Sequence, residues 1–123
     1  MRTNTACWFE IYVQNLKKAK AFYEGLLGVS LSRLNSPDME MWAFPAENES
    51  FGIGGALVHM PGFPARGNTT ITYFACEDCA VEAGSVSALG GRLEKPKFSI
   101  GEYGHIRLAY DPEGNMFGLH SLK

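Results

Sequence analysis

The stretch WFEIYVQNLKKAKAFYEGLLG, residues 8–28, carries a strand pattern followed directly by a helix pattern. Its first six residues are rich in aromatic and β-branched side chains, which favour an extended strand. Asn15 is suited to cap a helix, and apolar residues then recur at helical spacing up to Gly28, a residue type that commonly ends helices. The three shorter strand-like segments that follow span residues 29–34, 39–44 and 52–60. The first half of the chain therefore predicts a βαβββ module.

The same order of elements recurs in the second half. A strand is expected at residues 70–76, then a helix that begins after Asp78 and runs to Leu89, then three more strands. A constant offset of 63 residues aligns the helix starts, helix stops and last turns of the two halves, pairing Asn15 with Asp78, Gly28 with Gly91, Asn48 with Asp111 and Gly55 with Gly118. The sequence therefore predicts one module present twice.

Two such modules predict an α+β fold, in which a cupped mixed sheet carries helices on its outer face. A chain of 123 residues has the usual length of one domain. We expect a single domain over residues 1–123, with module 1 at 1–60, a linker at 61–68 and module 2 at 69–123. A cavity between the modules is the expected place for a small molecule.

Composition excludes several classes of function. Apolar residues make up 46% and charged residues 20% of the chain, as in ordinary globular proteins. The net charge is −2 and the eleven basic residues are scattered, so we expect no nucleic-acid partner. We find no apolar run near the roughly 20 residues that cross a bilayer, and expect no membrane partner. Three cysteines suit free thiols in a reducing compartment, which predicts a cytoplasmic protein.

Alternation along the first and last strands predicts which side chains face the cavity. The apolar set of the first strand, suited to packing on the helix, comprises Phe9, Ile11 and Val13. Trp8, Glu10 and Tyr12 then lie on the opposite face, and the same reasoning places His120 on that face of the last strand. The repeat offset extends this set to an expected ring of Glu10, Leu57, Tyr73 and His120.

A carboxylate, an imidazole and a phenol in one apolar cup favour acid–base chemistry, because desolvation and mutual attraction move pKa values toward working pH. We expect Glu10 to act as general base and His120 as its partner or proton donor. Tyr73 would orient the substrate or stabilise a developing oxyanion. Glu10 and His120 could instead hold a divalent metal ion, or form a purely structural buried pair.

The remaining candidates are aromatic and rim residues. We expect a small molecule to contact Trp8, Tyr12, Trp42, Leu57, His59 and Phe63. For Trp8 and Trp42 a place in the core is an equal alternative. His59 lies beside the expected linker, where a solvated histidine at the rim is the alternative.

The motifs that open and close the chain resemble those of the glyoxalase/bleomycin resistance/dioxygenase superfamily, also called the vicinal oxygen chelate superfamily. They are Trp8–Leu16, Ala21–Glu24, Leu27–Gly28, Asp111–Asn115 and Gly118–Ser121. The chain is most similar to the glyoxalase-like branch related to lactoylglutathione lyase. In metal-dependent members, four His or Glu ligands occupy positions that correspond here to Trp8, Gly55, Ile71 and Gly118. None of these can ligate a metal, so the resemblance implies that the classical nickel or zinc glyoxalase I centre is missing.

Two functions follow from these patterns. The first is a glyoxalase-like enzyme that performs proton transfer or lyase or isomerase chemistry on a small organic molecule, with or without a divalent metal. The alternative is a non-catalytic protein of the bleomycin-resistance type, which sequesters a planar or cationic compound between Trp8, Trp42 and Phe63. The resemblance also implies a homodimer, with each cavity formed within one chain or across two.

Overall fold

The computed structural model describes residues 6–37, 39–47, 52–62 and 70–123, which form two sheets. The first sheet contains β1 (Trp8–Tyr12), β2 (Ser32–Leu34), β3 (Glu40–Ala43) and β4 (Gly54–His59), in the order β1-β4-β3-β2. The second contains β5 (Thr72–Ala75), β6 (Arg92–Leu93), β8 (His105–Tyr110) and β9 (Met116–Ser121), in the order β5-β9-β8-β6. A further short strand, β7 (Phe98–Ser99), also pairs with β8.

Each sheet has the topology of a βαβββ module. The first strand pairs in parallel with the last, β1 with β4 and β5 with β9, while the other pairs are antiparallel. The helix that follows the first strand is α1 (Leu16–Leu27) in one module and α2 (Cys79–Ala83) in the other. The predicted α+β fold with two tandem modules is therefore confirmed. Most of the linker expected at 61–68 falls outside the described residues.

Helix α1 forms as its sequence predicts. The side chain of Asn15 accepts a hydrogen bond of 3.0 Å from the backbone N–H of Lys18, which caps the first turn. Gly28 ends the helix in the left-handed conformation, with φ of 66°. The apolar positions of the helix are buried, among them Phe22 and Tyr23. Burial of this stripe fixes α1 on the sheets.

Helix α2 is shorter than predicted, because it ends at Ala83 and not at Leu89. Beyond it the chain continues as tight turns, in which Val86 N–H bonds to the carbonyl of Ala83 and Gly90 N–H to that of Ser87. Glycine and serine at positions 84, 85 and 87 are poor helix formers, which favours such turns over a regular helix. The second module also contains a short 3-10 helix, η1 (Gly101–Tyr103).

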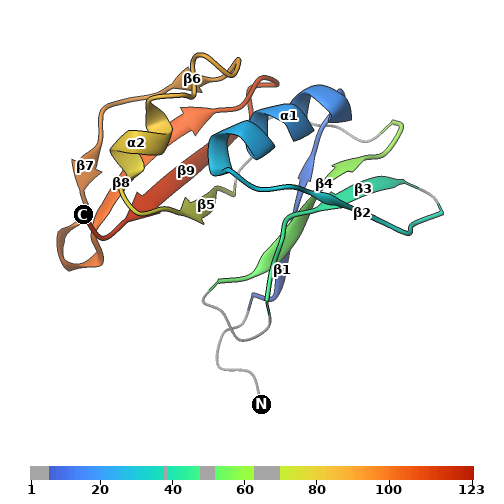
Figure 1. Cartoon of the computed structure of the whole chain (residues 1–123), viewed down its shortest axis with the longest axis horizontal. Helices are drawn as coiled ribbons and strands as arrows, with labels where there is room; N and C mark the ends of the chain where they lie inside the picture. The colour runs from blue at the N-terminus through green and yellow to red at the C-terminus, as the bar shows by residue number, and fades with distance from the viewer. Residues whose placement is uncertain (1–5, 38, 48–51, 63–69) are drawn as a thin grey trace.

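The hydrophobic core is shared by the two modules. Figure 1 shows α1 lying over the junction between the two sheets and α2 lying over the second sheet. Tyr23 of α1 contacts the rings of Phe44 and Phe74, at centroid distances of 5.8 and 5.7 Å, and so joins side chains from both halves. Phe9 and Phe74, from the edge strands β1 and β5, lie with ring centroids 6.0 Å apart.

Polar contacts also join the modules. The carboxylate of Glu113, in the β8–β9 turn, accepts hydrogen bonds from the backbone N–H groups of Gln14 at 2.6 Å and Asn15 at 2.5 Å. These groups precede α1, where a negative charge is favourable. The β8–β9 turn of module 2 is thereby fixed against the helix of module 1.

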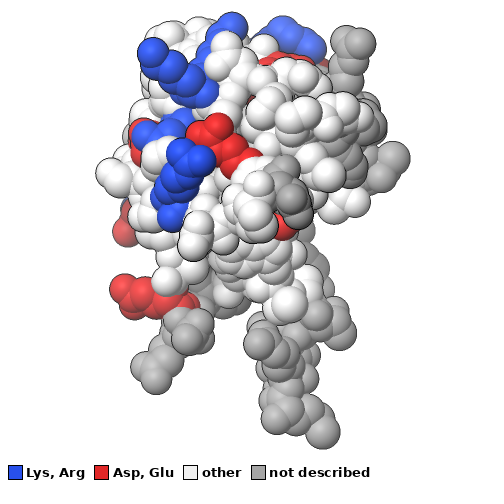
Figure 2. Space-filling model, turned by 90° about the vertical axis from the view of Figure 1, so that its right-hand side faces the viewer, with Lys and Arg blue, Asp and Glu red and all other residues white. Residues whose placement is uncertain are grey.

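The charged side chains form a mixed pattern. On the side of the molecule that carries the first sheet, Figure 2 shows basic and acidic groups lying near one another, with uncharged areas between them. Neither described helix has the length and apolarity needed to cross a membrane.

Candidate functional site

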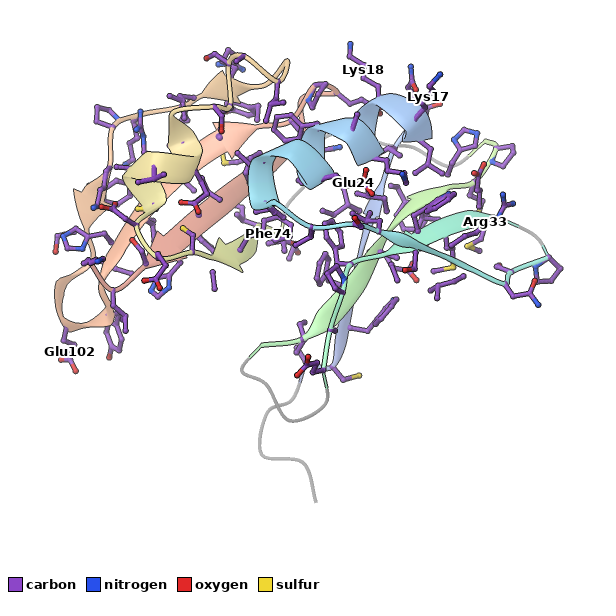
Figure 3. The ribbon with its side chains drawn as sticks, in the orientation of Figure 1. Lys17, Lys18, Glu24, Arg33, Phe74 and Glu102 are labelled. Carbon is purple, nitrogen blue, oxygen red and sulfur yellow. The ribbon has the colours of Figure 1, made fainter. Side chains whose placement is uncertain are left out.

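The strongest candidate site is a cavity of about 630 Å³ between the two modules. Its walls are mainly apolar and come from β1, from the end of α1, from the residues that follow α1 and β3, from the segments before β4 and β5, from β5 and from α2. The rings are those of Trp8, Phe9, Phe44, Tyr73 and Phe74. Figure 3 places Phe74 below the C-terminal end of α1, between the two sheets. Cavities of this size and composition are typical of small-molecule sites.

The position of the cavity follows from the sheet order. Strands β1 and β5 are edge strands, each with one neighbour in its own sheet. Side chains from both faces of an edge strand can reach the space beside it, and Tyr73 and Phe74 both line the cavity although they alternate along β5.

A thiol and a carboxylate add polarity to this wall. Cys76 follows β5, and its pKa is raised to about 12 by burial and, secondarily, by the charge of Glu82. Its Sγ donates a hydrogen bond of 3.4 Å to the carbonyl of His120. Because the thiolate is the nucleophilic form, Cys76 is not an activated nucleophile at neutral pH. Glu82, in α2, also lines the cavity.

Glu10 is the centre of a second polar cluster on the exposed face of β1. One carboxylate oxygen accepts a hydrogen bond of 3.2 Å from the indole of Trp8, and the other accepts one of 2.7 Å from the hydroxyl of Tyr12. The pKa of Tyr12 is raised, mainly by this hydrogen bond to Glu10. Trp8 also lines the cavity, whereas Glu10 and Tyr12 do not. The predicted common face of these three residues is correct.

The predicted ring of Glu10, Leu57, Tyr73 and His120 is wrong at Leu57. Leu57 is fully buried in the core and pairs with Ile11 across the β1–β4 ladder, so it faces the helix, opposite to Glu10. The error comes from aligning Gly55 with Gly118. A side chain at Gly55 would collide with the core ring of Phe9, whereas one at Gly118 would collide with Tyr73, on the other face of its sheet. The two glycines face opposite ways, because a shift of one residue reverses every side chain of a strand.

His120 and Tyr73 share a face of the second sheet, as predicted. Tyr73 pairs with Gly118 and is 47% exposed. The Nε2 atom of His120 lies 2.7 Å from the carbonyl oxygen of Tyr103. His120 and Glu10 therefore belong to different sheets and have different partners, and neither lines the cavity. The structure does not bring the expected acid–base pair together there.

Trp42 and His59 lie at a separate, shallower hollow of about 530 Å³ beside the first turns of α1. Trp42 pairs with Leu57 and so faces the helix, where the ammonium of Lys20 lies 4.8 Å from its ring centroid. His59 Nδ1 lies 3.0 Å from the carbonyl of Val13. The expectation that Trp42, Leu57 and His59 line one pocket with Trp8 is therefore wrong. Phe63 lies outside the described residues.

The donor set does not fit the metal centre that metal-dependent relatives contain. The position paired with Trp8 on β4 is Gly54, whereas the family resemblance pointed to Gly55 as a ligand position, and neither offers a donor atom. No three His, Cys, Asp or Glu side chains of the described ranges lie close enough to hold a metal ion. Glu10 and His120, the predicted pair of ligands, already make the contacts given above. We therefore derive no chemistry through a metal.

The cavity contains residues that the sequence did not reveal. Phe9 was expected to pack only on the helix, because period-two alternation assigns each strand residue to one face and does not register that an edge strand exposes both. The sequence assigned neither Phe44 nor Phe74 to a cavity. Glu82 gave no signal, since one acidic residue in a short amphipathic helix is usually solvated.

Comparison with known proteins identifies relatives of the whole chain. The family model described as the glyoxalase/bleomycin resistance protein/dioxygenase superfamily matches residues 6–119. The protein named "Putative glyoxylase CFP32" from Mycobacterium bovis is 27% identical over 118 residues, which are 95% of this chain and 44% of the relative. The same values hold for its counterpart from Mycobacterium tuberculosis. The chain thus spans less than half the length of these relatives.

Solved structures show the same fold. Glyoxalase I from Zea mays superposes with a TM-score of 0.73 at 21% identity, covering 94% of this chain and 45% of the maize chain. A superfamily member from Sphaerobacter thermophilus superposes with a TM-score of 0.72 at 22% identity, covering 96% of this chain and 97% of its own. At these identities the similarity establishes the fold and not the reaction.

Proposed function

Because the chain belongs to the glyoxalase/bleomycin resistance protein/dioxygenase superfamily, we propose that it is a glyoxalase-like member that binds a small organic molecule in the cavity between its modules. The observation that carries this proposal is the aromatic cavity of about 630 Å³ beside the edge strands β1 and β5. Binding without chemistry, as in the sequestering alternative, is the function that this geometry supports best.

The walls indicate a flat, largely apolar ligand. Trp8 and Tyr73 are 44% and 47% exposed, although large aromatic side chains are usually buried more completely. Stacking between rings and release of water from apolar surface would both favour an aromatic compound. A ligand that fills much of the cavity would bury these two rings together with that of Phe74.

Catalysis has weaker support in the cavity itself. Cys76 keeps its proton at neutral pH, since its pKa is raised to about 12, and the metal-ligand positions carry no donors. Proton transfer by Glu10 is the second candidate, because the indole of Trp8 joins the cavity wall to that carboxylate through a hydrogen bond of 3.2 Å. A substrate stacked on Trp8 could present an acidic C–H to Glu10. Homodimer formation and a cytoplasmic location remain predictions from the resemblance and the cysteine content.

Tryptophan fluorescence tests the binding proposal. In a Trp42→Phe variant Trp8 is the single tryptophan, because the chain contains two. We expect saturable quenching by some members of a panel of planar aromatic compounds. Ala75→Phe, which adds a ring to the cavity wall, should weaken that quenching, whereas Ala80→Phe, on the exposed side of α2, should not. A flat response to the whole panel, or equal binding by both variants, would contradict the proposal.

A further inference from the structure

One carboxylate oxygen at the cavity lacks the partner that burial demands. Oε1 of Glu82 is shielded from solvent and has no hydrogen-bond partner among the described residues. A shielded polar atom without a hydrogen-bond partner is costly, and proteins usually provide a donor for it. Since Glu82 also lines the cavity, a bound molecule can supply that donor.

Within the part of the chain that the structure describes, the groups around Glu82 do not supply a positive charge. Cys76 stays a neutral thiol. After burial, the charge of Glu82 and a side-chain hydrogen bond with its carboxylate raise the pKa of Cys76, so this neighbour offers Glu82 a weak donor and no positive charge. Lys97 lies on the same side of the second module, but its ammonium is 2.8 Å from the carboxylate of Asp78, which it pairs with. Asp78 in turn caps α2 through the backbone N–H of Ala80. This ion pair holds Lys97 at the start of α2, so the ammonium of Lys97 is engaged by Asp78 and not by Glu82.

The rest of the wall favours a cation with an aromatic body. The rings of Trp8, Tyr73 and Phe74 present electron-rich faces, which attract positive charge as well as apolar surface. A single carboxylate among such rings selects for charge more strongly than the same group in water, because the surrounding low dielectric strengthens its field.

We propose that the cavity selects aromatic amines, whose ammonium group donates a hydrogen bond to Oε1 of Glu82 while the ring system lies against the aromatic wall. This inference rests on the proposed small-molecule binding in the same cavity. It adds the class of ligand and assigns Glu82 as the residue that determines specificity.

Paired ligands test the inference. The probes are 1-naphthylmethylamine, which is protonated at neutral pH, and 1-naphthylmethanol, its neutral analogue of similar shape. Binding is followed by quenching of Trp8 in the Trp42→Phe background. We expect the amine to bind roughly tenfold tighter or more, as for a hydrogen bond to a charged group. Glu82→Gln should lower the affinity for the amine much more than the affinity for the alcohol, and so remove this preference.

Glu77→Gln is the matched control, because Glu77 is exposed, precedes α2 and does not line the cavity. It should keep the preference for the amine. Equal binding of amine and alcohol by the unmodified protein would overturn the role of Glu82 but leave the binding proposal intact. This is the result expected where an ordered water molecule already donates a hydrogen bond to Oε1. A preference that survives Glu82→Gln would also overturn it. Absence of binding by both probes would contradict the inference and the proposed function together.

The unliganded protein provides an independent measurement. Since Oε1 of Glu82 has no hydrogen-bond partner among the described residues, Glu82→Gln removes no contact at that atom, and the midpoint of thermal unfolding should stay constant or rise. A clear fall in the midpoint, beyond that of Glu77→Gln, would show that Glu82 is already paired and would overturn the inference.

Discussion

The hydroxyl of Tyr23 donates a hydrogen bond of 2.9 Å to Oδ2 of Asp111, although the two residues lie 88 positions apart and in different modules. Both side chains are buried, at 0% and 3% exposure. Asp111 also accepts hydrogen bonds from the backbone N–H groups of Glu113 and Asn115, which shape the β8–β9 turn. This bond therefore joins helix α1 of module 1 to the β8–β9 turn of module 2. The cavity lies between these two modules.

Tyr23→Phe should destabilise the protein by about 1–3 kcal/mol, because among the described residues Oδ2 of Asp111 then keeps only the side-chain N–H of Asn115 as a donor in a buried site. Urea denaturation followed by circular dichroism measures this loss. Tyr103→Phe, at a position 69% exposed, is the control and should change stability by less than about 0.5 kcal/mol. Equal stability of the two variants would show that the bond does not hold the modules together.

Stability should fall at alkaline pH through the same residue. Burial, followed by the negative charge of Asp111, raises the pKa of Tyr23 well above its ordinary value of 10.0. The unfolded chain therefore releases this proton at lower pH than the folded protein does. The stabilisation is complete below about pH 10 and is lost as pH rises from there toward the folded-state pKa. Between pH 9 and 11 the urea midpoint should fall more steeply for the unmodified protein than for Tyr23→Phe, and parallel curves would contradict this.

Glu113→Gln should lower the free energy of unfolding by about 1 kcal/mol or somewhat more. It removes the negative charge of the carboxylate that accepts hydrogen bonds from the N–H groups of Gln14 and Asn15 before α1. Glu102→Gln is a matched control, since Glu102 is exposed at the end of the second sheet away from α1 (Figure 3). The same denaturation assay applies. A loss as large for Glu102→Gln as for Glu113→Gln would mean that net charge, and not the contact to α1, sets the effect.

Gly55→Ala and Gly118→Ala should differ, although both introduce a methyl group that collides with a ring. Phe9, next to Gly55, is packed against Phe44 at a centroid distance of 5.6 Å and cannot move freely, so we expect a loss of about 2–3 kcal/mol. Tyr73, next to Gly118, is about half exposed and can swing away, so that loss should stay below about 1 kcal/mol. Comparison of the two unfolding free energies checks the assignment of the glycines to opposite faces, and the reverse order would contradict it.

Much of the fold could be predicted from local patterns. Helix α1 begins after Asn15 and ends at Gly28, because side-chain capping and the left-handed backbone conformation are local properties of asparagine and glycine. The candidate site could be predicted only in part. Alternation placed Trp8, Glu10 and Tyr12 on one face. The register of a strand relative to its counterpart in the other module depends on tertiary packing, which a fixed sequence offset does not describe, and Gly55 and Gly118 therefore face opposite ways.

The separation of Glu10 from His120 could not be predicted for a similar reason. Alternation assigns each to a face of its own sheet, yet how two sheets approach each other is set by contacts such as those of Tyr23 with Phe44 and Phe74. The cavity therefore opens beside the edge strands, where Phe74 and Glu82 take part, rather than over the faces that carry Glu10 and His120.

The most direct test of the cavity as the binding site is a titration of isotope-labelled protein with 1-naphthylmethylamine, followed by two-dimensional NMR of the backbone amides. Shifts are expected to concentrate at Trp8, Phe9, Tyr73 and Phe74, with a smaller set at Glu82 in α2. Shifts confined to Trp42 and His59, or to the strand faces around Glu10 and His120, would contradict the account.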